Sequence, residues 1–371
     1  MSGLAREQIV DMINWWLKNT TAVGETAKQV KLANGYIDIF TAAPSVNGTG
    51  VLSNVDNLMV NGHSLGGHLA TAFTRLFGGQ WGIGQTSTYN SAGFNPASEL
   101  FFKNIELLLD DGMGLGRFPD AGEQSNFFAE HGINVTTQDL FNGQQGQRVG
   151  LFNEEGTGLA NHSMYKLTDV LALGNVLSAI DSSFGIAQMN ILFELSANQA
   201  KSSLEKMLDA VGELFIGEEL GNTPVSDDDT AEGRKTYHSN LFTLQKKLFT
   251  NLSSTSPTLK PQYQNLQLVN VANLTAAAND DSVAGHAYRY ALVNLIPFTI
   301  TGSSALYTHH NQNGELNAEN FSEQYLADRA NMLQWLIKYT YEGLEYGEYL
   351  SADGFDGNVT YTDLSSETNN G

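Results

Sequence analysis

A serine set between closely spaced glycines is the clearest chemical feature of this sequence. Residues 58–67 read LMVNGHSLGG, which places Gly62 two positions before Ser64 and Gly66 two positions after it. This spacing is typical of a nucleophile elbow, a tight turn from a strand into a helix that lifts the serine hydroxyl clear of the sheet. An apolar run precedes the motif and a helical pattern follows it, so the local sequence supplies both elements that such a turn needs.

A base must accompany this serine, because a hydroxyl becomes a good nucleophile only when a neighbouring group removes its proton. Of the eight histidines, His162 alone follows the last predicted strand of the N-terminal half, where the base belongs if serine, acid and histidine follow one another along the chain. His131, which follows an earlier predicted strand, is the alternative. We expect His63 to point away from the exposed side of the turn, and His68 lies one helical turn beyond the serine.

The carboxylate that orients the base should leave the end of the strand that precedes the histidine's strand. Residues 126–130 form that predicted strand, and Glu130 stands at its carboxyl end. Asp139 in the following loop is the alternative, since aspartate is the more common residue in this role. Weaker candidates are Asp120, Glu154, Glu155 and Asp169.

Two backbone N–H groups are needed to stabilise the oxyanion that forms when such a serine attacks a carbonyl. The N–H of Leu65, just after the nucleophile, is the first. The second normally comes from a loop after an earlier strand, but residues 1–60 contain no strand followed by a glycine-rich string. The sequence therefore predicts a domain abbreviated at its N-terminus, with weak activity unless another segment supplies this donor.

Short strands alternate with helices around these residues. Apolar runs predict strands at residues 58–60, 86–90, 126–130 and 148–152, and helical periodicity predicts helices at residues 4–18, 65–77, 97–109 and 164–180. Residues 36–40 are a further strand candidate, whereas residues 19–34 and 44–50 have the composition of loops. This alternation predicts an α/β domain with a largely parallel sheet of about five strands, followed by mostly helical sequence.

Two segments carry a resemblance to a known family: residues 62–68 (GHSLGGH) and residues 161–165 (NHSMY). Together they resemble α/β-hydrolase-fold lipases, in particular the lipase-like domains of type I-secreted, RTX-type bacterial proteins, over residues 5–175. The resemblance implies carboxylic-ester hydrolysis, often of lipids, by a Ser-His-acid triad. Many of those relatives have an aspartate soon after the acid strand, where Asn134 stands here.

These observations predict three parts along the chain. We expect an α/β-hydrolase-like catalytic domain in residues 1–185, a mostly helical region that could cap the site in residues 186–350, and a polar tail in residues 351–371. The resemblance implies secretion without an N-terminal signal peptide, and the sequence leaves a cytoplasmic location open.

Composition excludes several other classes of function. The 371 residues include 19 Lys and Arg against 40 Asp and Glu, a net charge of −21 that disfavours nucleic acid as a partner. Cysteine is absent, which excludes disulfides, thiolate metal sites and a cysteine nucleophile. No stretch is apolar enough for a transmembrane segment. We expect an ester or lipid as substrate and no cofactor, because the only calcium-like pattern is one weak DGFDG string at residues 353–357. The oligomeric state is not predicted.

Two other functions fit the same motif. The chain could be a degenerate, non-catalytic hydrolase module of a larger secreted protein, which the missing oxyanion donor would favour. It could also be a serine peptidase or thioesterase on the same fold, because the Ser-His-acid chemistry is shared.

Overall fold

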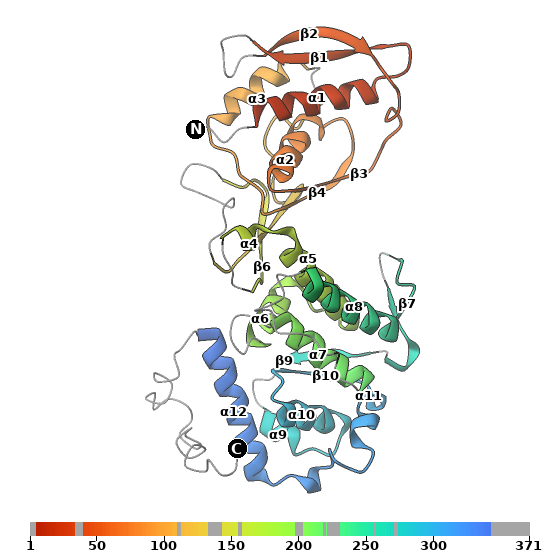
Figure 1. Ribbon diagram of the computed structural model, residues 1–371, viewed down its shortest axis with the longest axis vertical. Coiled ribbons are helices and arrows are strands. Elements are labelled where there is room, and N and C mark those ends of the chain that lie inside the picture. The colour runs from red at the N-terminus through yellow and green to blue at the C-terminus, as the bar shows by residue number, and fades with distance from the viewer. Residues whose placement is uncertain are drawn as a thin grey trace. The chain divides into compact units, whose positions relative to one another are not determined.

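The computed structural model describes residues 5–33, 40–109, 113–132, 143–154, 158–196, 203–217, 220, 231–254, 257–263, 265–270 and 274–342. The chain divides into two compact units, Met1–Leu167 and Thr168–Gly371 (Figure 1). The division falls inside helix α5 (Met164–Ile180), whereas the sequence placed the boundary between residues 185 and 186. The predicted tail, residues 351–371, lies outside the described residues.

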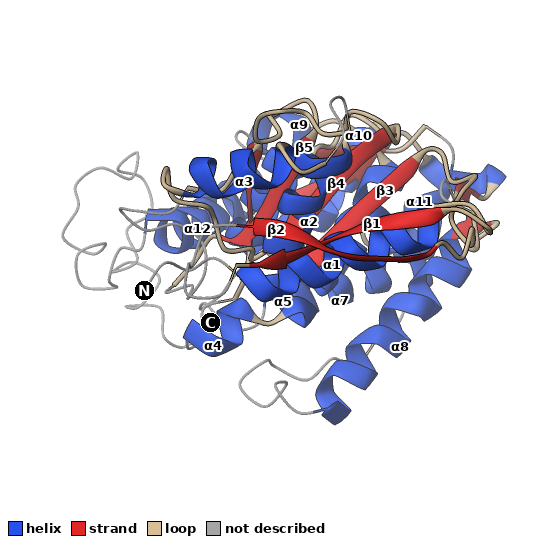
Figure 2. Cartoon of the chain, turned by 90° about the horizontal axis from the view of Figure 1, so that it is seen from above, coloured by secondary structure: helices blue, strands red, loops and turns tan. Residues whose placement is uncertain are grey.

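A four-stranded parallel sheet organises the first unit. Its strands are β3 (Leu58–His63), β4 (Ile83–Tyr89), β5 (Gln124–Ala129) and β6 (Gln147–Leu151), hydrogen-bonded in sequence order. Figure 2 shows β3, β4 and β5 side by side. Helix α2 (Leu65–Phe77) connects the first pair of strands and α3 (Ser98–Glu106) the second, while α4 (Gly158–His162) and α5 follow the last strand. The predicted α/β class and parallel sheet are confirmed, with four strands in the described chain where about five were expected, and all four carboxyl ends lie at one edge.

Helix α2 meets the sheet through hydrogen bonds as well as apolar contacts. The hydroxyls of Thr74 on α2 and Thr86 on β4 are 2.6 Å apart and buried. Gln124 of β5 donates from Nε2 to the Thr71 hydroxyl at 2.9 Å. Because buried polar groups need partners, these pairs fix how α2, which begins directly after Ser64, sits on the sheet.

The N-terminal segment contains an antiparallel pair that the sequence did not predict. After α1 (Arg6–Thr20), strand β1 (Thr26–Leu32) pairs with β2 (Phe40–Asn47), so the expectation of loops at residues 19–34 and 44–50 was wrong in part. Only Ala27 and Val30 of β1 are buried, and this sparse alternation hides the strand. The pair forms its own sheet beside α1 (Figure 1). In the described chain β3 therefore pairs with β4 alone, at the edge of the parallel sheet.

The core of this unit lies between α1, α2 and α3. Trp16 of α1, Phe77 of α2 and Phe101 of α3 belong to one cluster of buried apolar side chains. Strand β2 contributes Phe40, whose ring meets that of Phe101 edge-on at 4.8 Å. The apolar faces of the predicted amphipathic helices thus pack on one another, which stabilises the layer that carries the serine turn.

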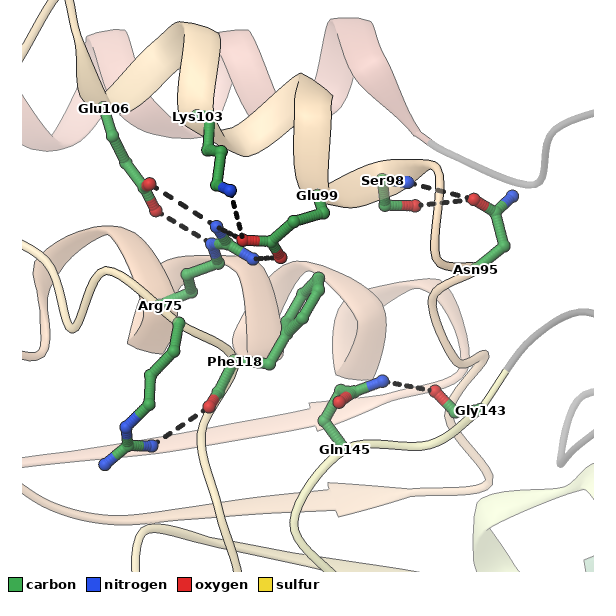
Figure 3. Close-up of polar contacts among 10 residues, drawn as sticks. Arg75, Asn95, Ser98, Glu99, Lys103, Glu106, Phe118, Gly143 and Gln145 are labelled. Carbon is green, nitrogen blue, oxygen red and sulfur yellow. Dashed lines mark hydrogen bonds and ion pairs between the residues drawn. The ribbon is translucent and has the colours of Figure 1, made fainter.

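A buried arginine joins α2 to α3. The Arg75 side chain is fully buried and pairs with Glu99 at 2.5 Å and with Glu106 at 2.8 Å (Figure 3). Its guanidinium also lies over the rings of Phe102 and Phe118. The hydrogen bond from Arg75 lowers the pKa of Glu99, which keeps this carboxylate charged. Because one buried guanidinium on α2 pairs with two carboxylates on α3, these contacts link the two helices.

The second unit is mostly helical. Its helices are α6 (Ile186–Ser196), α7 (Ser203–Ile216), α8 (Ala231–Leu248), α9 (Leu274–Ala278), α10 (Val283–Asn294), α11 (Ser304–Thr308) and α12 (Glu323–Glu342), with 3-10 turns η2 (Pro261–Tyr263), η3 (His309–Asn311) and η4 (Ala318–Asn320). Two small antiparallel pairs accompany them: β7 (Phe249–Thr250) with β8 (Thr258–Leu259), and β9 (Gln267–Asn270) with β10 (Phe298–Thr301). Within the described ranges, no helix is both long and apolar enough to cross a membrane.

Candidate active site

Ser64 sits on a sharp turn between β3 and α2, as the motif predicts. Its backbone has φ 56° and ψ −122°, a conformation that non-glycine residues rarely adopt. The Ser64 N–H donates to the carbonyl of Tyr89 at the end of β4, at 3.0 Å. Such backbone strain persists only where surrounding contacts impose it, and it is found most often at functional sites.

Two glycines allow this turn: Gly62, which belongs to the motif, and Gly67, which does not. A Cβ on Gly62 would lie 2.2 Å from the carbonyl oxygen of Gly66, and a Cβ on Gly67 would lie 2.4 Å from the Cβ of Ser91. A Cβ on Gly66 would meet no atom within 4 Å. The close approach after the serine therefore requires Gly67 and not Gly66, because the first turn of α2 packs against Ser91, just beyond the end of β4.

The structure brings His162 to the serine. His162 ends α4, after the last strand of the sheet, and its Nε2 lies 2.8 Å from Ser64 Oγ. Burial, and secondarily the charge of His63, lower the pKa of His162 below 6.5. At neutral pH the imidazole is therefore uncharged, and with its proton on Nδ1 it accepts the hydroxyl hydrogen bond of Ser64 at Nε2.

The other histidines near the motif have different surroundings. The expectation that His63 points away was wrong: its ring lies 4.9 Å from the His162 ring, and its Nε2 is 2.8 Å from the His162 carbonyl oxygen. The reason is that the end of α4, which bears His162, lies against the end of β3. His131 packs against Phe152, and Ser64 Oγ makes its hydrogen bond to His162 instead. His68 is buried against the Phe94 ring at 3.8 Å.

The structure does not bring Glu130, the first candidate for the acid, to His162. Glu130 continues the extended chain after β5 through a hydrogen bond to the Leu151 carbonyl, and its side chain is exposed. Its carboxylate lies beside Gly150 of β6, where an added Cβ would be 2.8 Å away. Successive strand residues alternate between faces, so Glu130 falls on the face opposite to Ala129. Asp139, the alternative, lies outside the described residues.

The weaker acid candidates lie in different parts of the chain. Asp120 pairs with Arg117 at 3.3 Å on an exposed turn, and Asp169 of the second unit contacts His238 at 2.7 Å. Glu154 is buried in the loop after β6. Glu155 and Asn134 lie outside the described residues.

The backbone N–H of Leu65, the expected oxyanion donor, lies at the start of α2. Leu65 is the first residue of α2, and the first N–H groups of a helix have no intrahelical acceptor, so its N–H is free to bind a developing negative charge. In the described chain, no strand of this sheet precedes β3 along the sequence, and residues 34–39 lie outside the described residues.

Three buried asparagines join the strand ends around the site, and sequence reasoning missed them. They are Asn90 after β4, Asn153 after β6 and Asn161 in α4, all at most 2% exposed. Asparagines are usually exposed, so their residue type gave no hint of burial. The only signal was their place next to predicted strands or next to the histidine.

Metal-ligating side chains do not cluster around the site in the described residues. In the part of the chain that the structure describes, no three His, Asp or Glu side chains gather closely enough to hold a metal ion. The weak calcium-like string at residues 353–357 lies outside that part.

Comparison with known proteins gives no relative for this chain. No family model, no curated protein and no solved structure matches it. What the site can do therefore rests on its own geometry: a strained serine at the end of a parallel strand, hydrogen-bonded to a neutral imidazole, beside a free helix N-terminus.

Proposed function

We propose that this protein is a serine hydrolase of carboxylic esters with an α/β-hydrolase arrangement. The observation that carries the proposal is the 2.8 Å approach of His162 Nε2 to Ser64 Oγ. Ser64 directly follows the first strand of the parallel sheet, and His162 ends α4, the short helix that follows the last strand. Serine on a strand-to-helix turn and histidine after the last strand is the order that this chemistry takes on such a sheet.

The chemistry follows from these positions. Ser64 Oγ attacks the ester carbonyl while His162 Nε2 takes its proton, and the N–H of Leu65 stabilises the tetrahedral oxyanion. The imidazolium then gives the proton to the leaving alcohol. The alcohol departs, and the acyl group stays bound to Ser64 Oγ. Water activated by His162 repeats these steps in reverse and frees the acid.

We propose Asp139 as the acid that orients His162, in place of Glu130. The exposed carboxylate of Glu130 lies beside Gly150 of β6. The segment from residue 133 to residue 142, which follows the strand expected to bear the acid, contains one carboxylate, that of Asp139. This assignment keeps the order of serine, acid and histidine along the chain.

A non-catalytic hydrolase module is the second candidate, and the edge position of β3 favours it. The peptidase and thioesterase alternatives share the same catalytic groups, so only substrates separate them. The resemblance of residues 62–68 and 161–165 to secreted lipases supports an ester or lipid substrate and an extracellular location.

A panel of p-nitrophenyl esters of increasing acyl length, with an acyl thioester and a chromogenic peptide beside them, tests these options. We expect Ser64-dependent turnover of the esters, with Ser64→Ala as the control. Preference for the thioester or peptide would move the assignment to those classes. No turnover of any substrate by folded protein would favour the non-catalytic module.

A further inference from the structure

We propose that Asn90 and His63 are positioning residues that hold the main chain of His162 in place relative to Ser64. This inference rests on the proposed function, because it concerns how the serine and its base are kept in contact. Both side chains bond to the same atom, the carbonyl oxygen of His162: Asn90 Nδ2 at 3.1 Å and His63 Nε2 at 2.8 Å.

Asn90 lies immediately after β4 and is fully buried. Its Nδ2 also donates to the carbonyl of Asn161 at 3.1 Å, and its Oδ1 accepts the N–H of Ala129 at 3.0 Å. Its backbone N–H bonds to the carbonyl of Phe127 at 2.8 Å. One amide side chain therefore connects the end of β4 to the end of β5 and to the end of α4, which bears His162.

The backbone of Asn90 is adapted to this role. Its φ of 44° lies in the left-handed region, which asparagine tolerates better than other non-glycine residues. With two donor hydrogens on two carbonyls and its oxygen on an N–H, the side chain has partners for each group.

The serine turn is hydrogen-bonded to the same end of β4. The N–H of Ser64 bonds to the carbonyl of Tyr89, the residue directly before Asn90. The serine turn and the end of α4 are thus both hydrogen-bonded to consecutive residues at the end of one strand. This arrangement fixes the separation of the two main chains, and hence the distance from Oγ to Nε2.

His63 adds a second support from the neighbouring strand. It is the last residue of β3 and directly precedes Ser64, so its bond to the His162 carbonyl joins the base to the serine turn itself. A glutamine can place its Nε2 donor near the position of the imidazole Nε2, whereas leucine has no donor. The pair His63→Gln and His63→Leu therefore separates the hydrogen bond from the bulk of the side chain.

Further amides brace the loop behind this contact. Asn153 Oδ1 accepts the N–H of His131 at 2.8 Å, and Asn153 Nδ2 donates to the His131 carbonyl at 3.0 Å. Asn161 Nδ2 donates to the same carbonyl at 3.2 Å. Since a displacement of about 1 Å between reacting groups can lower a rate about 10²-fold, a loop held at this many points matters for the reaction.

The test is the second-order rate of covalent labelling by a fluorophosphonate, expressed per folded protein, for the full chain and its variants. We expect His63→Leu and Asn90→Asp to label about 10- to 100-fold more slowly than wild type. Asn90→Asp keeps the shape but sets a carboxylate oxygen against the two carbonyls. We expect His63→Gln to label within about threefold of wild type, since it keeps the donor.

Two measurements distinguish positioning from mere stability. The matched control is Asn61→Asp, which adds the same charge at an exposed site on β3 and should label like wild type. Because the charge of His63 contributes to the lowered pKa of His162, both His63 variants should move the acid limb of the labelling rate to higher pH. Of the two His63 variants, only His63→Leu should have a lower labelling rate on the plateau at higher pH, where His162 is uncharged.

Wild-type rates in folded His63→Leu and Asn90→Asp would overturn the inference while leaving the proposed function intact. If wild type itself fails to label, the proposed function fails, and crystal structures of the variants still decide the inference. Ser64 Oγ and His162 Nε2 within hydrogen-bond distance in both variants would refute it, and a longer separation would support it.

Discussion

Acidification should destabilise the fold through His68, the buried histidine one turn after the nucleophile. Burial lowers the pKa of His68 from 6.5 to about 4, against weaker opposing hydrogen bonds from the chain at Ala92 and Gly93. The unfolded chain therefore binds this proton more readily than the folded chain. Stability from the uncharged His68 is fully present above pH 6.5 and is lost as the pH falls from 6.5 towards 4.

The size of the effect follows from the two pKa values. Linkage gives a loss of about 2 kcal/mol in the free energy of unfolding at pH 5, and of about 3 kcal/mol once the pH is below 4. The Nε2 atom of His68 is buried without a hydrogen-bond partner, so the backbone hydrogen bonds at Ala92 and Gly93 offset only part of the cost of the charge.

Urea denaturation of the full chain at a series of pH values between 7 and 4 measures this loss. The control is His68→Phe, which keeps a flat ring against Phe94 but cannot titrate. We expect the variant to lose about 2 kcal/mol less than wild type between pH 7 and pH 5. Equal losses in the two proteins would refute the reasoning, because the pH dependence would then arise from other groups.

Three further predictions concern the turn and its base. Gly67→Ala should abolish ester turnover or destabilise the fold, because its Cβ would lie 2.4 Å from that of Ser91. Gly66→Ala is the control and should fold normally by circular dichroism, and a well-folded, active Gly67→Ala would contradict the packing described. The acid limb of kcat/KM should have its midpoint below pH 6.5, because the neutral form of His162 is the base and its pKa is lowered; a midpoint above 6.5 would show that an opposite charge dominates. Glu130→Gln should retain turnover while Asp139→Asn loses about 10⁴-fold in kcat, and the reverse result would restore the acid expected first.

Local sequence was enough to predict the serine turn and the sheet behind it. The apolar run before Ser64 and the helical periodicity after it depend on neighbours in sequence, and they match β3 and α2. His162 could be chosen because a parallel sheet with strands in sequence order brings the ends of its first and last strands to one edge.

The missed features depend on contacts that sequence does not display. Strand β1 is polar because it covers α1 with only two buried side chains, so its alternation is too sparse to recognise. Glu130 has the expected position along the chain, but sequence does not display which face its side chain takes, and its carboxylate lies beside Gly150. Asn90 acts through carbonyls more than 70 residues away along the chain, and nothing in its own neighbourhood indicates them.

Oxyanion stabilisation sets the expected level of activity. We propose the N–H of Leu65, the first residue of α2, as an oxyanion donor, and loss of one such donor costs about 10²- to 10³-fold in turnover. Among the described residues β3 has a strand partner on one side alone, and such an edge is a place where another strand can pair.

Covalent labelling of Ser64 is the most direct test of the central claim. A fluorophosphonate should add once to the wild-type chain, and peptide mass spectrometry should place it on Ser64. Folded Ser64→Ala should not be labelled, and folded His162→Ala should be labelled far more slowly, since it lacks the base that lies 2.8 Å from the hydroxyl. Labelling that survives Ser64→Ala, or a folded wild type that is never labelled, would contradict the assignment of this site as the active site of a serine hydrolase.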